Sequence, residues 1–380
     1  MIAIIIQSKN VWNQDKFSPL QIRVEGGRIA EILKYDETKC TEDFHDAMII
    51  PGLVDVHTHG YMGVDCNHAS REWLEKWVRY LPSEGVTSVV PSTTSCPEEL
   101  LLGSLAVIAE AIEHPTPGAE ILGVNIEGPF ISQKYRGAQN PNNIVKPAVE
   151  TLQKYISAAK GNVLYCLIAP EEDEGLETTK FALSQGIKVA IGHSGASVEL
   201  CAEAKKLGVS SFTHTFNGMP GLHHRNLGPA GAAMYFEDMY AEVVGDGIHV
   251  DFKVVRLLGK LKGPDKLILI TDSAAVKGFE PGHYNVAGRE VLLGADGSCR
   301  LPDGSIASSV GKMNEFLGNL INHAGLDKVT AINAATSNPA SMLGLGDKKG
   351  SIKVGYDADM VVLSNDYSVC QTFVKGQKML

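Results

Sequence analysis

The sequence predicts an α/β protein, a (β/α)8 TIM-like barrel with a small β-sandwich domain formed by both chain termini. Strand and helix patterns alternate through the middle of the chain, and the strand patterns there number eight. Short strand patterns without helices occupy both ends of the 380 residues. Alternation favours a parallel sheet, and eight strands suggest closure into a barrel. An open doubly wound sheet is the competing architecture, disfavoured because no G-x-G-x-x-G motif follows the first strand.

The small domain is expected to combine residues 1–49 with residues 350–380. Near the N-terminus an alternating strand pattern leads into the turn Glu25-Gly26-Gly27-Arg28, and another strand pattern follows. The C-terminal part contributes further short segments, and we expect the two parts to pair into one sandwich. The expected strands are Ala3–Gln7, Leu20–Val24, Ile29–Leu33, Ser351–Val354, Met360–Leu363 and Thr372–Val374.

The barrel is expected to span residues 50–349, without an internal repeat or a low-complexity linker. Its strands are predicted at Ile49–Val56, Thr87–Ser92, Ile121–Ile126, Val163–Ala169, Lys188–Ile191, Ser211–Thr213, Ala241–Val244 and Leu267–Thr271. Helices are predicted between them, for example at Ser70–Glu84, Pro97–Glu113, Ala148–Ala159, Leu176–Gln185, Ser197–Leu207 and Phe252–Leu261.

Composition excludes several classes of function. The net charge of −10 without a basic run argues against nucleic acid, although one or two local cations could still bind a small anion. The apolar N-terminus lacks a basic leader and a cleavage site, so it is interpreted as a strand, and no segment reaches the length of a membrane span. Seven scattered cysteines without a C-x-x-C pair indicate reduced thiols and a cytoplasmic protein.

Side chains that can bind metals or move protons follow six of the eight strands. His57 and His59, in PGLVDVHTHG, lie two residues apart and so point to one side of the strand. Each such residue alone could be structural, as a solvated or core histidine or as a helix N-cap at Asp272. Their coincidence at one barrel rim favours a site for Zn²⁺ or Fe²⁺. The residues are His57, His59, Glu127, His193, His214, the Asp246–His249 segment and Asp272.

These residues lie in motifs that resemble the amidohydrolase superfamily and, more closely, the N-acetylglucosamine-6-phosphate deacetylase family. The similarity extends over essentially the whole chain, in the right order. The most specific motifs are EGPF, LHHR and DGIH, and the others are IGHS, THTFNGM, TDSAA, SNPASMLGL and GSIKVGYDADMVVL.

The resemblance implies a role for each metal-site residue. Glu127, His193 and His214 match the family's principal metal ligands. His57 and His59 match a second metal position that some members use and others lack, so one or two divalent ions are expected. Asp272 matches the catalytic acid/base, which would take a proton from metal-activated water and return it to the departing amine.

The resemblance also implies residues that bind the substrate, and a homodimer. Arg225, His249 and the backbone N–H groups of the Asn217-Gly218 turn are expected to bind phosphate, with His249 as a possible helper at the oxyanion. His224 is expected to reach the active site of a partner subunit. The loop Ile306-Ala307-Ser308 is expected to close over the sugar, and Ala138 and Gln139 are expected to line it.

The sequence departs from the family pattern around the sugar and phosphate. Gln139 replaces a histidine, Gly218 replaces an alanine, Ser308 replaces a glycine, and Asn226-Leu227-Gly228 replaces an acidic residue and a proline. We therefore expect hydrolysis of an N-acetylhexosamine 6-phosphate, with N-acetylglucosamine 6-phosphate favoured and the galactosamine epimer as the alternative. Another amidase or deaminase and a catalytically silent barrel remain further alternatives. The retained ligands and Asp272 argue against the silent barrel.

Overall fold

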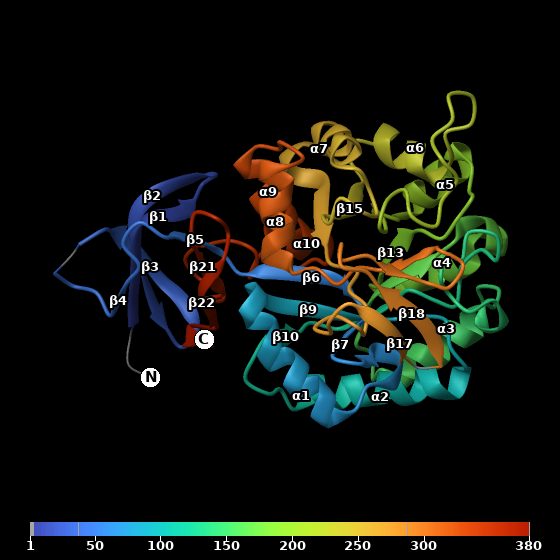
Figure 1. Ribbon diagram of the computed structural model, residues 1–380, viewed down its shortest axis with the longest axis horizontal. Helices are drawn as coiled ribbons and strands as arrows, with labels where there is room; N and C mark the ends of the chain where they lie inside the picture. Colours follow the sequence, from blue (N-terminus) through green and yellow to red (C-terminus); the bar gives the residue numbers. More distant parts are fainter. Residues whose placement is uncertain (1–3, 37, 287, 380) are drawn as a thin grey trace.

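The computed structural model describes residues 4–36, 38–286 and 288–379. Its centre is a parallel β-barrel with helices around it (Figure 1). The last strand meets the first, because the backbone N–H of Asp272 donates to His57 O over 2.8 Å. The barrel strands run in the order β6 (Leu53–Thr58), β9 (Val86–Thr93), β11 (Val124–Ile126), β12 (Val163–Ile168), β13 (Lys188–Ile191), β14 (Ser211–Phe212), β15 (Tyr240–Val244) and β16 (Leu267–Ile270).

The barrel prediction is confirmed, with two of the predicted strands interrupted. The first divides at Gly52 into β5 (Met48–Pro51) and β6. A Cβ on Gly52 would lie 2.2 Å from Thr87 Oγ1, so this close approach of the backbone requires glycine. The third divides into β10 (Glu120–Ile121), which pairs with β9, and β11.

The predicted helices form within a few residues of their expected bounds. Ser70 and Ser197 cap α1 and α5, because their side-chain oxygens accept from Trp73 N and Leu200 N. The predicted helices are α1 (Arg71–Tyr80), which continues into η2 (Leu81–Glu84), α2 (Glu98–Glu113), α3 (Val149–Ala158), α4 (Glu177–Ser184), α5 (Val198–Leu207) and α7 (Phe252–Lys266). Additional helices are α6 (Gly228–Tyr235), α8 (Met313–Asn322), α9 (Lys328–Ala335) and α10 (Ser337–Met342). Short elements are β7 (Gly60–Tyr61), β8 (Val64–Asp65), η1 (Cys66–His68), η3 (Pro141–Asn143), η4 (Pro170–Glu172) and η5 (Glu174–Leu176).

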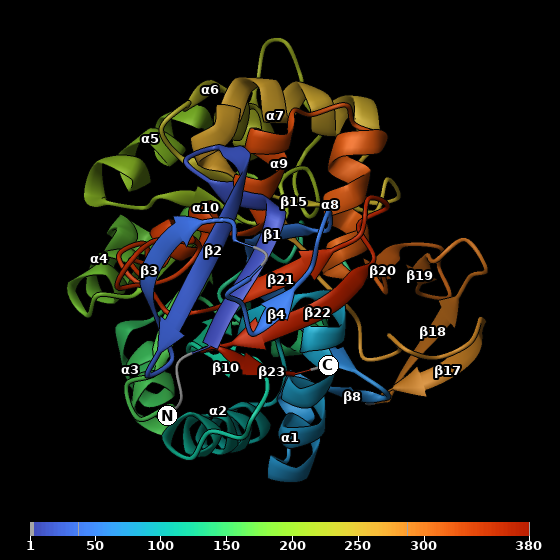
Figure 2. The same ribbon diagram turned by 90° about the vertical axis from the view of Figure 1, so that its left-hand side faces the viewer.

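Strands from both termini form one sheet beside the barrel (Figures 1 and 2). The described strands run in the order β23 (Gln377–Lys378), β22 (Val369–Val374), β21 (Met360–Leu363), β5, β1 (Ile4–Asn13), β2 (Lys16–Glu25) and β3 (Arg28–Lys34), with β4 (Glu42–Asp43) beside β1. Ser351–Val354 is not a strand, a correction to the prediction, although Ile352 is buried in the sheet's core. Ala3, at the start of the first predicted strand, lies outside the described residues.

Side chains along β5 and β21 point alternately to the two faces of this sheet, and one of the two sets packs against the barrel. Ile49, Met360 and Val362 face the sheet's own core, where Ile22 and Phe373 also meet. Since Ile22 and Phe373 come from opposite halves of the strand order, the sheet curls over that core. Neighbouring residues in the same strands point the other way and join the barrel core, namely Met48, Ile50, Val361 and Leu363.

A four-stranded antiparallel sheet follows β16 and projects at the side of the barrel (Figure 2). We call it the flap, and it comprises residues 282–308 apart from the undescribed residue 287. Its strands are β17 (Gly282–Val286), β18 (Arg289–Leu293), β19 (Cys299–Arg300) and β20 (Ile306–Ser308). The segment predicted as a loop at Ile306–Ser308 is therefore a strand. Among the helices of the described residues, none combines the length and apolar character needed to cross a membrane.

Candidate active site

The strand-end residues meet in a cavity of about 380 Å³ at the carboxyl ends of the barrel strands. Of the side chains predicted for the site, His57 lies buried beneath this cavity, and Arg225 and His224 lie outside its lining. The predicted residues that line it are His59, Glu127, Ala138, Gln139, His193, His214, Asn217, Gly218, His249, Asp272, Ile306, Ala307 and Ser308.

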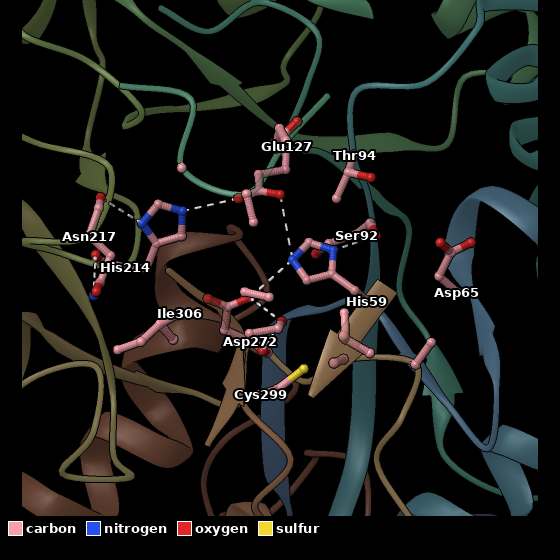
Figure 3. Close-up of a pocket in the computed structure, with 18 of the residues that line it drawn as sticks. His59, Asp65, Ser92, Thr94, Glu127, His214, Asn217, Asp272, Cys299 and Ile306 are labelled. Atoms are coloured by element: carbon pink, nitrogen blue, oxygen red, sulfur yellow. Dashed lines mark hydrogen bonds and ion pairs between the residues drawn. The ribbon is translucent and has the colours of Figure 1, made fainter. Parts of the chain in front are cut away.

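Glu127, which follows β11, is the centre of this cluster. Its Oε1 lies 3.0 Å from both His193 Nε2 and His214 Nε2 and 3.6 Å from His57 Nε2. Its Oε2 lies 3.5 Å from His59 Nε2. Figure 3 shows His59 and His214 directed toward Glu127 from opposite sides. One carboxylate thus faces four imidazoles.

Three of these rings are held at their other nitrogen by backbone carbonyls. His193 Nδ1 lies 2.8 Å from Tyr135 O, His59 Nδ1 lies 3.0 Å from Ser92 O, and His214 Nδ1 lies 3.2 Å from Asn217 O. A carbonyl can only accept, so Nδ1 of each ring carries a proton, and a ring without a second proton has its lone pair on Nε2. Each lone pair then faces an anionic oxygen, an arrangement that a cation between them would satisfy.

The carboxylates and histidines of the cluster also shift one another's pKa values. Burial alone would lower the pKa of His57 and of His59, but the nearby carboxylates outweigh it and the pKa of each is raised. Burial alone would raise the pKa of Glu127, but the surrounding histidines hold that pKa well below its usual value. Two groups of ligand atoms lie within 4.8 Å of one another: His57, Glu127 and His214, and His57, His59 and Asp272. The donors present therefore fit a divalent metal ion.

Three site residues have an unusual backbone conformation. His193, His214 and Asp272 have φ values of 45°, 24° and 47°, in the region that residues other than glycine rarely adopt. Each lies two residues after the end of a barrel strand. Such strain is typical of functional sites, where the surrounding fold holds the residue in place.

Asp272 faces both the metal cluster and the cavity. Its Oδ1 lies 3.0 Å from His59 Nε2 and accepts from Ser308 Oγ over 3.3 Å. Burial would raise the pKa of Asp272, but the hydrogen bond with His59 and the charges of the neighbouring histidines hold the pKa at about 2. The carboxylate is therefore ionised at neutral pH and available to accept a proton.

Gln139 presents a buried donor to the cavity. Its Oε1 accepts from Ser95 N over 2.8 Å and from Ser95 Oγ over 2.6 Å. Gln139 is 5% exposed, and its Nε2 has no hydrogen-bond partner within the described part of the chain. A buried amide without a partner is costly, so a ligand acceptor in the cavity would satisfy it.

The turn after β14 leaves one of its two predicted backbone donors available. Asn217 N already donates to His214 O over 3.0 Å, whereas Gly218 N makes no hydrogen bond to any described residue. Gly218 has a φ of 60°, and a Cβ there would lie 2.5 Å from His193 Nδ1. Glycine at this position lets the turn pack directly against His193.

His249 is paired with a carboxylate three residues earlier. Its Nδ1 lies 2.6 Å from Asp246 Oδ2. Burial would lower the pKa of His249, but the hydrogen bond and charge of Asp246 outweigh it, so the pKa is raised. His249 can therefore present positive charge at the cavity near neutral pH.

Arg225 and His224 lie on an exposed loop before α6 that projects away from the barrel (Figure 1). Arg225, predicted to bind phosphate, therefore does not line the cavity of its own subunit. The flap instead brings Arg289 and Cys299 into the lining, and β8 adds Asp65, none of which sequence reasoning identified. No strand-end pattern marks these positions.

Comparison with known proteins identifies the family. The amidohydrolase family model matches residues 48–379. The chain belongs to the amidohydrolase family. Among curated members, N-acetylglucosamine-6-phosphate deacetylase of Bacillus subtilis (strain 168) is 36% identical over 335 residues, 87% of this chain and 84% of its own length. N-acetylgalactosamine-6-phosphate deacetylase of Escherichia coli O157:H7 is 30% identical over 94% of each chain.

Solved amidohydrolase structures agree over the full chain. A mutant of N-acetyl-D-glucosamine-6-phosphate deacetylase from Mycobacterium smegmatis, solved in complex with N-acetyl-D-glucosamine-6-phosphate, superposes with a TM-score of 0.94 at 26% identity and covers 100% of both chains. The Thermotoga maritima N-acetylglucosamine-6-phosphate deacetylase superposes with a TM-score of 0.89 at 28% identity, with 99% of both chains covered. The resemblance inferred from the motifs is confirmed.

Proposed function

We propose that this amidohydrolase removes the acetyl group from an N-acetylhexosamine 6-phosphate, with N-acetylglucosamine 6-phosphate favoured, and yields acetate and the amino sugar phosphate. The observation that carries the proposal is the convergence of Glu127, three histidines and Asp272 on one cavity, with His57 buried beneath it. The substrate class follows from the names of the relatives that match nearly the whole chain.

Glu127, His193 and His214 would hold the principal metal ion, and His57, His59 and Asp272 are placed to hold a second. Imidazole and carboxylate donors suit Zn²⁺ or Fe²⁺. When bound, the ion would lower the pKa of a water molecule and polarise the amide carbonyl.

The protein's own groups supply the proton transfers. Asp272, ionised at neutral pH, would take a proton from the attacking water and deliver it to the amide nitrogen, because an amine leaves poorly unless protonated. Gln139 Nε2 is available to donate to a carbonyl or hydroxyl of the substrate. His249 is a further donor at the cavity wall and could support the oxyanion.

Phosphate recognition would combine groups of one subunit with groups of its partner. His249, Gly218 N and Arg289 line or face the cavity of the same subunit. Arg225 and His224 are exposed on the projecting loop, where they could reach the site of a second copy in a homodimer. We also place the enzyme in the cytoplasm, in keeping with its seven free thiols, all within the described residues.

The alternative substrate is N-acetylgalactosamine 6-phosphate. It is supported by the Escherichia coli O157:H7 relative and by Gln139, which departs from the family's usual histidine beside the sugar. The two sugars differ in one hydroxyl configuration, so a single donor in the cavity could discriminate between them.

A panel of four substrates tests the proposal: the two N-acetylhexosamine 6-phosphates and the two sugars without phosphate. Amine release is measured alongside metal content. We expect a phosphorylated gluco substrate to give the highest kcat/KM, and Arg225→Ala to raise KM for phosphorylated sugars only. Preference for the galacto epimer would establish the alternative. A metal-loaded protein inactive on all four would exclude deacetylation of this class and favour another amidase or a silent barrel.

A further inference from the structure

His57 differs from the other three histidines in what holds its Nδ1. The other three contact backbone carbonyls, whereas His57 Nδ1 lies 3.2 Å from the carboxylate oxygen Oε2 of Glu242 and 3.0 Å from Thr213 Oγ1. Glu242 and His57 are 185 residues apart in the sequence. Glu242 lies in the middle of β15, a charged residue in the otherwise largely apolar strand YAEVV.

Glu242 is built into the barrel interior below the cavity. It is 0% exposed and is not part of the cavity lining. Its Oε1 accepts from Tyr165 OH over 2.7 Å, and its Oε2 accepts from Thr213 Oγ1 over 2.7 Å and from His214 N over 3.2 Å. A buried carboxylate persists only when donors satisfy it, and Glu242 receives them from β12, from the end of β14 and from His57.

This network determines which nitrogen of His57 faces the metal cluster. Thr213 has one hydroxyl proton and donates it to Glu242, so both groups near His57 Nδ1 act as acceptors. Nδ1 must then carry the proton, and the neutral ring keeps its lone pair on Nε2. His57 Nε2 is buried, has no hydrogen-bond partner among the described residues, and lies 3.6 Å from Glu127 Oε1.

We propose that Glu242 is a positioning residue that makes His57 a metal ligand and thereby completes a second cation position with His59 and Asp272. The inference rests on the proposed metal-dependent function, and it adds a residue that does not touch the cavity. A carboxylate behind a histidine fixes the ring and increases its strength as a ligand, and loss of such a partner typically lowers metal affinity about 10–100-fold. Removal of Glu242 should therefore weaken this position selectively.

The competing explanation is that Glu242 only joins strands inside the barrel. Tyr165→Phe provides the matched control, because it removes a donor to Oε1 of the same buried carboxylate and leaves the Oε2 contact with His57 intact. A merely structural role predicts similar effects of Tyr165→Phe and Glu242→Gln on metal binding. A positioning role predicts an effect of Glu242→Gln alone.

Metal binding provides the test, and it needs no substrate. Apo wild type, Glu242→Gln and Tyr165→Phe are equilibrated with buffered free Zn²⁺, and bound metal per subunit is measured by mass spectrometry. We expect two ions in the wild type and in Tyr165→Phe, and an affinity for one of the two lowered about 10–100-fold in Glu242→Gln. Identical isotherms for wild type and Glu242→Gln, or a wild type that binds one ion only, would overturn the proposal.

A second measurement covers the case in which Glu242→Gln does not fold. Spectra of Zn²⁺-loaded wild type labelled with ¹⁵N-histidine report the tautomer of each ring, and His57→Asn assigns the His57 signal. We expect His57 to carry its proton on Nδ1. A proton on Nε2 would exclude His57 as a ligand through that nitrogen. Failure of the deacetylase proposal alone would leave both results unchanged, because neither depends on the substrate.

Discussion

Each of the four histidines around Glu127 is held by another group at its second ring nitrogen. Backbone carbonyls of Tyr135, Ser92 and Asn217 hold three, and the side chain of Glu242 holds the fourth. Without these acceptors a ring could rotate or carry its proton on Nε2, and its lone pair would no longer point at Glu127. The direction in which each ring presents Nε2 is thus set by the hydrogen bond at its Nδ1.

Asp272→Asn should strongly lower turnover while the principal metal ion stays bound. The amide keeps the volume of the carboxylate but cannot accept the proton of an attacking water, and general base catalysis typically contributes about 10²–10⁴-fold. We expect kcat to fall by that factor with the principal metal retained. Ser308→Ala is the control, because it removes a donor to Asp272 but keeps the carboxylate. If Asp272→Asn kept more than a tenth of the activity, the proton-transfer role would be wrong.

The pH dependence of KM should report the His249–Asp246 pair. The pKa of His249 is raised, so its cationic form persists above the usual value near 6.5, and phosphate is mostly a dianion above about pH 6. The attraction between the His249 cation and the phosphate dianion is strongest between about pH 6 and the pKa of His249. KM for a phosphorylated sugar should therefore rise as pH increases through the pKa of His249. Asp246→Asn removes the carboxylate that raises the pKa of His249, so KM should begin to rise at a lower pH.

The control for this prediction is the same sugar without phosphate, whose KM should not follow the titration of His249. Steady-state kinetics over pH 5.5–9 with both sugars measure the effect. Superimposable profiles of KM against pH for wild type and Asp246→Asn would show that His249 does not bind the phosphate.

At the scale of elements, the segment after β16 positions Asp272 through contacts with three neighbours. Ser273 O accepts from His59 N over 2.9 Å, which joins the segment to the end of β6. Ser309 N donates to Asp272 O over 2.9 Å, which joins it to the end of the flap. Lys277 Nζ lies 2.6 Å from Glu84 Oε2, which also accepts from Met313 N at the start of α8.

Removal of one partner of the Lys277–Glu84 pair should destabilise the protein. Both side chains are almost fully buried, at 4% and 0% exposure, so Lys277→Met leaves an uncompensated buried carboxylate. Such a change typically destabilises by about 3–5 kcal/mol. We expect the free energy of unfolding, measured in urea, to fall by that amount in Lys277→Met. It should fall less in Lys277→Met/Glu84→Gln, which removes both charges. A double variant less stable than the single variant would contradict this account.

At the scale of the whole molecule, the proposed metal site draws its residues from strands around the barrel. Glu127 follows β11, His193 follows β13, His214 follows β14, and the histidine pair ends β6. An ion bound there crosslinks elements that are far apart in the chain, and it binds the folded state in preference to the unfolded state. Metal binding should therefore contribute to the stability of the whole barrel.

Removal of metal by a chelator should lower the Tm. At a free ion concentration about 100 times Kd, binding contributes about 2.7 kcal/mol, which corresponds to a shift of several degrees in a protein of this size. Calorimetry before and after chelation, with Zn²⁺ added back, measures the shift. Mg²⁺ is the control ion, and it should not restore the Tm because it prefers oxygen ligands. An unchanged Tm after complete removal would argue against this contribution.

The sequence by itself determined the eight barrel strands, most of the helices between them, the pairing of the two termini and which histidines and carboxylates gather at the barrel rim. These features depend on local patterns: apolar runs, capping residues such as Ser70 and Ser197, and polar side chains where a strand stops. A parallel barrel brings all strand ends to one rim, so His57 and Asp272 could be placed together although 215 positions separate them.

Only the tertiary structure decided how those residues are held and what surrounds them. It placed Glu242 behind His57, turned residues 282–308 into a flap that carries Arg289 into the cavity, and left Arg225 outside it. The physical reason is that a hydrogen bond depends on the direction and distance of two atoms, and for residues on different strands these are set by packing across the barrel. Local patterns contain the periodicity of a strand, but not the partner that its side chain will meet.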